Sequence, residues 1–79
     1  MNALSEVEIA IVRALAEGLQ SKEIASVLDR SRTSIEFRIS TLLIKMEAKS
    51  RAQLVARGYQ VGLLSTEPIE EQLSVPIHG

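Results

Sequence analysis

The sequence predicts an all-α fold of four helices followed by a short C-terminal extension. Apolar residues recur at intervals of three and four along most of the chain, which is the period of a helix with one buried face. Serines precede several of these segments and glycines follow two of them, so the helix ends can be located. Alternating apolar and polar positions never persist, and the only aromatics are Phe37 and Tyr59, so no strand is expected.

The first helix is expected from about Glu6 to Glu17. Ser5 and Glu8 have the spacing of a capping box, in which each side chain accepts a hydrogen bond from the other residue's backbone amide. Gly18 follows the apolar segment and can end the helix in a left-handed conformation.

Two further helices are expected on either side of a tight break. The second helix begins at Ser21, which is predicted as its cap, and ends after about two turns at Asp29-Arg30-Ser31. The third runs from about Arg32 to Met46 with Ser31 as its cap. Its apolar stripe consists of Ile35, Ile39, Leu42, Leu43 and Met46.

The fourth helix is expected over about Arg51 to Val61, because Ser50 and Gln53 repeat the capping-box spacing and Gly62 follows. Residues 1–64 are therefore predicted to form one helical domain. Residues 65–79 contain two prolines and three acidic residues, which predicts an acidic, flexible tail. Its apolar residues could dock on the domain or on another chain; they are Ile69, Leu73, Val75 and Ile77.

Composition narrows the class of protein. The 79 residues are 46% apolar and 24% charged, which is typical of one folded domain. The chain begins without the basic and apolar segments of a secretory signal, has no apolar run long enough for a bilayer, and contains no cysteine. We therefore expect a cytoplasmic protein that makes no membrane contact.

The net charge of −1 conceals a separation of charge along the chain. Residues 21–57 carry eight cations and four anions, a net charge of +4, whereas residues 1–20 contribute −2 and residues 65–79 contribute −3. A local basic surface of this kind is what binding to phosphates requires, because the attraction acts over about a Debye length.

The residues needed for catalysis are missing from the sequence. There is one histidine, His78, close to the C-terminus, and there is no cysteine and no glycine-rich phosphate loop. No nucleophile and base can be paired, and no set of metal ligands is available. We expect no enzymatic activity, no cofactor and no metal.

A short helix, a tight break and a longer helix with a polar outer face form the pattern of a helix-turn-helix. In that motif the second helix lies in the major groove of DNA and presents its N-terminal residues to the base edges. Here the third helix would bury its apolar stripe and turn its opposite face outward. That outer face carries Thr33, Glu36, Phe37, Ser40 and Thr41.

Three short motifs occur in one register, without insertions or deletions between them. They are Leu4-Ser5-x-x-Glu8, Ala16-Glu17-Gly18 and Ser21-Lys22-Glu23-Ile24-Ala25-x-x-Leu28. The register continues through Ser31-x-x-Ser34-Ile35, Lys45-Met46, Arg51-x-Gln53 and Gly62-Leu63-Leu64. Over residues 4–64 this pattern resembles the DNA-binding domain of LuxR/GerE-type regulators. The resemblance implies a four-helix domain that binds double-stranded DNA as a homodimer and regulates transcription, with its fourth helix at the dimer interface. It also implies association with the bacterial nucleoid.

Together, the resemblance and the helical faces assign three groups of site residues. Base contacts, direct or supporting, are expected from Thr33, Glu36, Phe37, Arg38, Ser40 and Thr41. Phosphate contacts are expected from Ser21, Lys22, Arg32, Lys45 and Lys49. The dimer interface is expected to include Leu54, Val55, Tyr59 and Val61, which so small a core would leave incompletely covered.

Several positions depart from the family pattern. The family often has basic residues where Glu36 and Ser40 stand, and an apolar residue where Arg30 stands. Glu36 could accept a hydrogen bond from a cytosine amino group, or it could be an acid that blocks DNA binding. Phe37 could touch a thymine methyl group or pack against the first helix, and Tyr59 could lie in a dimer interface or pack within its own chain.

These departures keep two other functions open. The chain could be an interaction module that does not bind DNA and antagonises a full-length regulator by forming a heterodimer through the fourth helix or the tail. It could also resemble the promoter-binding region of sigma factors, which shares the helix-turn-helix pattern. The segment 51–64 matches the LuxR/GerE-type pattern and favours that family.

Overall fold

The computed structural model describes residues 4–64, and all four predicted helices are present in it. They are α1 (Glu6–Ala16), α2 (Ser21–Leu28), α3 (Arg32–Lys45) and α4 (Arg51–Gln60). No strand occurs among these residues, so the all-α prediction is confirmed, and each predicted boundary agrees to within one residue. The predictions for the tail 65–79 and for His78 lie outside the described residues.

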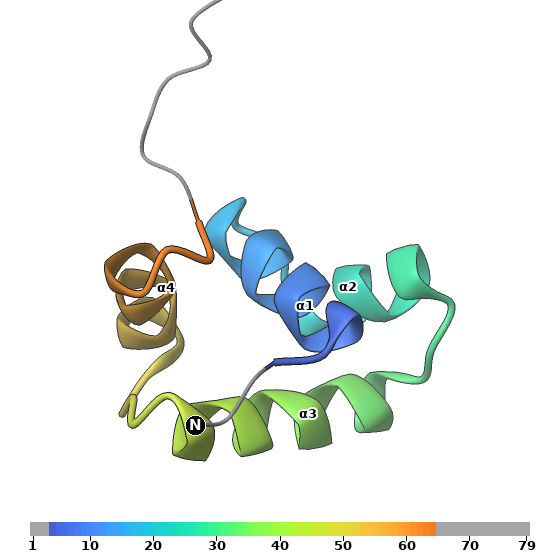
Figure 1. Cartoon of the computed structure of the whole chain (residues 1–79). Helices are drawn as coiled ribbons and strands as arrows, with labels where there is room; N and C mark the ends of the chain where they lie inside the picture. The colour runs from blue at the N-terminus through green and yellow to red at the C-terminus, as the bar shows by residue number, and fades with distance from the viewer. Residues whose placement is uncertain (1–3, 65–79) are drawn as a thin grey trace, which may run out of the picture.

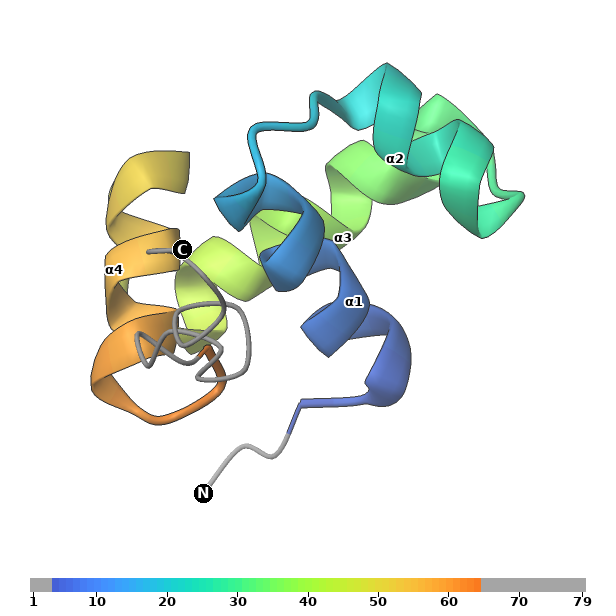
Figure 2. The ribbon, with the colours of Figure 1, turned by 90° about the horizontal axis from the view of Figure 1, so that it is seen from above.

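Helices α1, α2 and α4 pack on one side of α3. Figure 1 shows α3 running along one edge of the molecule, with α1, α2 and α4 all on the same side of it. Seen from above in Figure 2, α1 crosses α3 between α2 and α4. The α2–α3 pair forms the most extensive contact, and α1 packs on both α3 and α4. The side chains that meet in the centre are Ile11, Val12, Ile24, Ala25, Ile35, Ile39, Leu42 and Leu54.

The start of α1 has the predicted capping box. The Glu8 amide donates to the Ser5 hydroxyl over 3.1 Å, and the Ser5 amide donates to the Glu8 carboxylate over 2.9 Å. Gly18, with φ of 91°, adopts the predicted left-handed conformation after the helix. The structure therefore confirms both local signals at the two ends of α1.

Two of the predicted caps need correction. The residue before α2 is Gln20, whose amide donates to the Glu23 carboxylate over 2.7 Å, while Ser21 is the first helical residue and is buried. At α4 the Ser50 hydroxyl does accept from the Gln53 amide, but the Gln53 side chain accepts from Lys49 and not from Ser50. The cap of α2 thus lies one residue before the expected Ser21, and the Gln53 side chain accepts from the amide one residue before the expected one.

The break between α2 and α3 is a left-handed turn at Asp29, with φ of 57° and ψ of 48°. The Arg30 amide donates to the Ala25 carbonyl over 2.9 Å, which satisfies a carbonyl at the end of α2. The Ser31 hydroxyl then caps α3 by accepting from the Ser34 amide over 3.0 Å. The predicted break is thus confirmed, and it sets the direction of α3 relative to α2.

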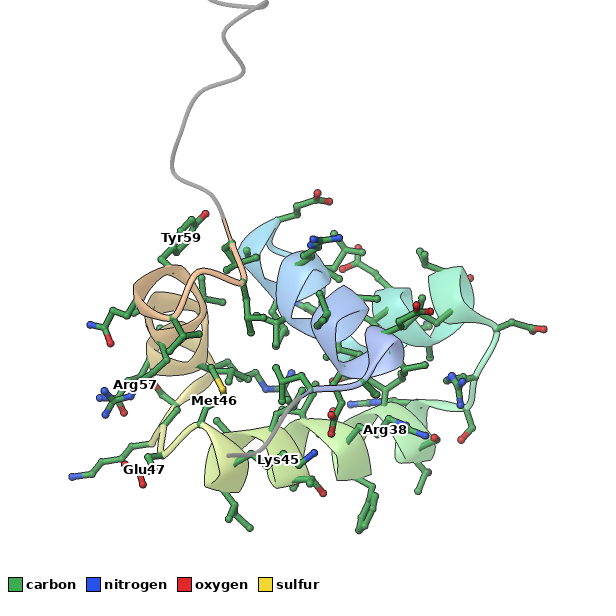
Figure 3. The ribbon with its side chains drawn as sticks, viewed as in Figure 1. Arg38, Lys45, Met46, Glu47, Arg57 and Tyr59 are labelled. Atoms are coloured by element: carbon green, nitrogen blue, oxygen red, sulfur yellow. The ribbon has the colours of Figure 1, made fainter. Side chains whose placement is uncertain are left out.

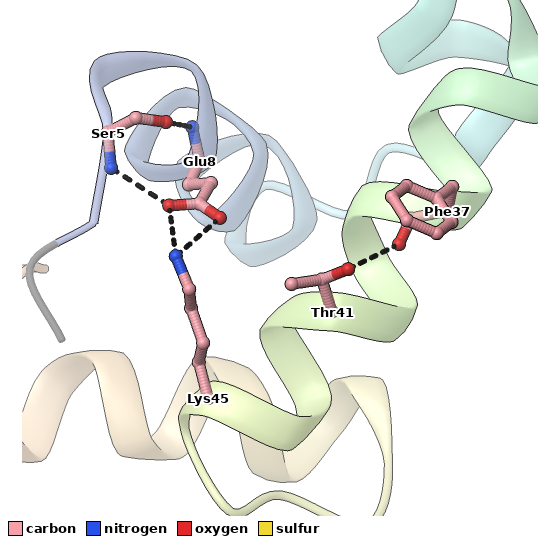
Figure 4. Close-up of polar contacts among 5 residues, drawn as sticks. All are labelled: Ser5, Glu8, Phe37, Thr41 and Lys45. Atoms are coloured by element: carbon pink, nitrogen blue, oxygen red, sulfur yellow. Dashed lines mark hydrogen bonds and ion pairs between the residues drawn. The ribbon is translucent and has the colours of Figure 1, made fainter.

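An ion pair connects the start of α1 to the end of α3. The Lys45 ammonium lies 3.1 Å and 3.0 Å from the two carboxylate oxygens of Glu8 (Figure 4). Burial by itself raises the pKa of Glu8, but hydrogen bonds from the Ser5 amide and from Lys45 outweigh it, so the pKa lies below its usual 4.5. Ionised Glu8 therefore stabilises the fold.

We predict that Lys45→Met lowers the free energy of unfolding by about 1–2 kcal/mol at pH 7, because it leaves a buried carboxylate without its cation. Since folding lowers the pKa of Glu8, its contribution is complete above pH 4.5 and is lost as the pH falls through the lowered value. The difference between variant and parent, measured by urea unfolding, should shrink below pH 4.5. The exposed Lys49→Met is the control; equal effects of both substitutions would contradict the prediction.

Candidate nucleic-acid interface

The outward side of α3 is a helical face that no other described element covers. Since α1, α2 and α4 lie on one side of α3, the opposite side faces solvent (Figures 1 and 3). Phe37 is 71% exposed and Ile44 is 79% exposed on this side. Their spacing of seven residues places them on one helical face, together with the exposed Thr33 and Ser40. Phe37 therefore does not pack against α1, and that alternative is wrong.

Two hydroxyl groups on this side, those of Ser40 and Thr41, donate back to the helix. The Ser40 hydroxyl donates to the Glu36 carbonyl, and the Thr41 hydroxyl donates to the Phe37 carbonyl, each over 3.1 Å (Figure 4 shows the second bond). Such bonds to the preceding turn are common for serine and threonine in helices. Two of the predicted base-contacting side chains thus use their protons within α3.

Glu36 forms an ion pair with a residue that the sequence analysis did not assign to the site. Arg51, the first residue of α4, donates to the Glu36 carboxylate over 2.9 Å and to the Ser21 hydroxyl over 3.0 Å. Hydrogen bonding from Ser21 and then from Arg51 lowers the pKa of Glu36 below its usual 4.5. The three residues join the starts of α2 and α4 to the outer side of α3.

This cluster borders a shallow basic hollow of about 430 Å³ beside the start of α2. The residues that line it carry three cations and one anion; they are Gln20, Ser21, Lys22, Arg32, Glu36 and Arg51. Lys22 and Arg32 are exposed, whereas Ser21 is buried. The structure therefore brings three of the expected phosphate-contacting residues together and adds Arg51.

The other expected phosphate-contacting residues lie elsewhere. Lys49 is exposed in the segment between α3 and α4. Lys45 extends toward α1, where its ammonium binds Glu8, so its phosphate contact stays a prediction that competes with an internal ion pair (Figure 4). Arg38, expected on the base side, is partly exposed on α3 (Figure 3).

The expected dimer residues of α4 divide between core and surface. The expectation that Leu54 is incompletely covered is wrong: it is fully buried, because this side of α4 packs on α1. Gly58 marks the same contact, since an added Cβ would lie 3.2 Å from Val12 Cγ1 and 3.0 Å from Leu64 Cδ1. Val55 is partly exposed, Tyr59 is 39% exposed and Val61 is 62% exposed. These three remain available to another chain.

The short α2, the left-handed break and the one-sided α3 make residues 21–45 a helix-turn-helix. The family described as bacterial regulatory proteins, luxR family, matches residues 2–57, and the chain belongs to this family. This result confirms the family resemblance. The family is one of regulatory proteins and not of enzymes.

Two curated relatives are similar to this chain. Over 64 residues it is 34% identical to the transcriptional regulatory protein YdfI of Bacillus subtilis (strain 168), and the match covers 81% of this chain and 30% of YdfI. Over 50 residues it is 40% identical to the nitrate/nitrite response regulator protein NarP of Escherichia coli (strain K12), covering 63% of this chain and 23% of NarP. The chain thus spans less than a third of either relative.

Residues 4–64 contain neither a candidate metal-ion site nor a candidate membrane-spanning helix. No cluster of three or more histidine, cysteine or acidic side chains is arranged there to bind a metal ion. None of the helices in that range has the length and hydropathy that a membrane span requires.

We predict that Arg51→Met and Ser21→Ala each raise the pKa of Glu36 toward 4.5, because each removes a donor that stabilises its carboxylate. The measurement is the pH titration of the Glu36 carboxyl carbon by NMR. Arg57→Met is the matched control, since that guanidinium donates to the Glu47 carbonyl and does not touch Glu36. A Glu36 midpoint that stays the same in all three variants would show that the cluster does not form in solution.

Proposed function

We propose that this chain binds double-stranded DNA as a homodimer and regulates transcription, with α3 in the major groove. The observation that carries the proposal is the free outer side of α3 with exposed cations at its N-terminal end. A recognition helix needs both features, because its face must enter the groove while basic side chains contact the phosphates on either side. The printed names of the two relatives, a transcriptional regulatory protein and a response regulator, support the regulatory role.

The basic hollow is the proposed anchor on the DNA backbone. Lys22 and Arg32 are exposed at its rim, and the helix dipole of α2 adds partial positive charge beside them. Lys49 would contact a phosphate farther along the strand. Contacts of this kind supply affinity and orientation for any sequence, whereas Glu36 and Ser40 on α3 would set the sequence preference.

The exposed side of α4 is the proposed dimer interface. Ala52, Ala56 and Tyr59 recur at intervals of four and three and are exposed, and Val55 lies beside them partly exposed. Small residues let two helices approach closely, and Tyr59 at the end supplies a large amphipathic surface. Two copies related by a twofold axis would then present two α3 helices to successive turns of DNA.

A second candidate function is the interaction module that does not bind DNA. The observation that favours it is the position of the Glu36 carboxylate. This group pairs with Arg51, whose charge is then no longer free to attract phosphates, and it places an acid on the surface that would face DNA. In that case the α4 surface would pair with a full-length regulator and disable it.

We expect the salt dependence of DNA binding to distinguish these functions. Binding of the chain to mixed-sequence duplexes, measured by fluorescence anisotropy at several salt concentrations, should weaken steeply as salt rises. Lys22→Ala and Arg32→Ala should weaken binding to every duplex by a similar factor. Each should also reduce the slope of log K against log salt by about one. The matched control is Arg13→Ala on α1, which is exposed away from the basic hollow.

In the same experiment, variants of Glu36 distinguish a role in base recognition from a role in blocking DNA. If Glu36 reads a cytosine, Glu36→Gln loses discrimination at one base pair, by about 1–3 kcal/mol. If Glu36 blocks DNA, the parent shows no salt-dependent binding and Glu36→Lys creates it. The second outcome would replace DNA binding by the interaction module.

We predict that Ala56→Glu and Tyr59→Glu shift the chain from dimer to monomer in sedimentation experiments while its helical circular dichroism is retained. Both residues are exposed in the single chain, so the new charges cost little there but would be buried at the interface. Ser26→Glu, at an exposed position of α2, should remain dimeric. Dimers that persist in both α4 variants would locate the interface elsewhere.

A further inference from the structure

The outer side of α3 carries an exposed apolar side chain, Phe37, next to three polar residues that already form hydrogen bonds within the chain. Glu36 binds Arg51, and the hydroxyls of Ser40 and Thr41 donate to carbonyls of α3. Phe37 lies among these three residues and is 71% exposed, without a described neighbour that covers it. Its phenyl ring is thus the exposed large apolar side chain in the N-terminal half of α3.

The position of Phe37 along α3 matches the part of a recognition helix that reaches the bases. Phe37 is the sixth of the 14 residues of α3, and residues near the start of such a helix contact base edges. Ile44 is the thirteenth residue and lies about 10 Å farther along the axis, toward the end that leaves the groove. The two exposed apolar residues therefore differ in their access to bases.

A phenyl ring cannot exchange hydrogen bonds with a base, so its chemistry selects an apolar partner. In the major groove that partner is the C5-methyl group of thymine, which distinguishes T·A from the other base pairs. The exposed cations Lys22 and Arg32 line the basic hollow beside the start of α3 and would contact phosphates while the ring faces the floor of the groove. This combination of an apolar ring and flanking cations complements DNA better than it complements an apolar protein surface.

We infer that Phe37 reads the methyl group of a thymine, so that each half-site of the preferred DNA contains a thymine opposite the first two turns of α3. This inference rests on the proposed DNA-binding function. Thr41 can add its methyl group to the same surface, while its hydroxyl donates its proton to the Phe37 carbonyl (Figure 4).

The test replaces thymine by deoxyuridine, which lacks the methyl group and is otherwise identical at the base edge. A duplex is first selected from a random pool with the full chain, and each thymine is then replaced singly. At one position or two adjacent positions per half-site, we expect the affinity of the parent to fall about threefold to fivefold, which corresponds to one buried methyl group. Phe37→Ala should bind the thymine and deoxyuridine duplexes equally well.

Ile44→Ala is the matched control, since it removes a similarly exposed apolar side chain from the same side of α3. It should retain the full dependence on the methyl group. Because Phe37 and Ile44 are both exposed, the two variants should fold like the parent, which circular dichroism checks.

Each other outcome overturns the inference in a recognisable way. If the parent binds every deoxyuridine-substituted duplex as tightly as the selected duplex, the recognition of a thymine methyl group is refuted. The proposal of DNA binding would then still stand. A chain that binds no duplex at any salt concentration would refute both. Loss of self-association in Phe37→Ala, with no dependence on the methyl group, would assign the ring to a protein contact instead.

Discussion

The one-sided burial of α3 is the constraint on which the rest of the structure depends. Ile35, Ile39 and Leu42 must be covered, and within residues 4–64 they are covered from one direction, by α1, α2 and α4. The left-handed residue Asp29 turns the chain after α2 so that α3 can lie across the other helices. Burial of one stripe therefore creates the exposed opposite side, and stability and the proposed DNA contact have the same origin.

The fold could be predicted from the sequence because its signals are local. The Ser5–Glu8 capping box, Gly18 and the caps at Ser31 and Ser50 each involve residues within four positions of one another, and their spacing is visible in the sequence. The errors at Ser21 and Gln53 are shifts of one residue. They arise because neighbouring polar side chains compete for the same free amides at a helix start.

The site could be predicted only in outline, because its geometry depends on pairs that are distant in sequence. Lys45 binds Glu8 across 37 residues and Arg51 binds Glu36 across 15, and periodicity contains no information about either pair. Leu54 was misassigned for a related reason. Helical spacing shows that Leu54 and Val55 are both candidates for burial, but only the packing of α1 against Gly58 determines which side of α4 faces inward.

The internal pairing of polar groups affects how this surface could recognise DNA. A lysine or arginine at the position of Glu36 or Ser40 would bind guanine strongly, but neither position carries a cation, and the neighbouring Arg51 of α4 is paired with Glu36. Breaking the Glu36–Arg51 pair to bind a base or phosphate would leave one charge without its partner, which offsets part of the gain. The exposed ring of Phe37 needs no such exchange, because it has no hydrogen bonds to lose. A surface of this design would gain its affinity from phosphates, and the apolar contact of Phe37 would add selectivity to whatever Glu36 and Ser40 contribute.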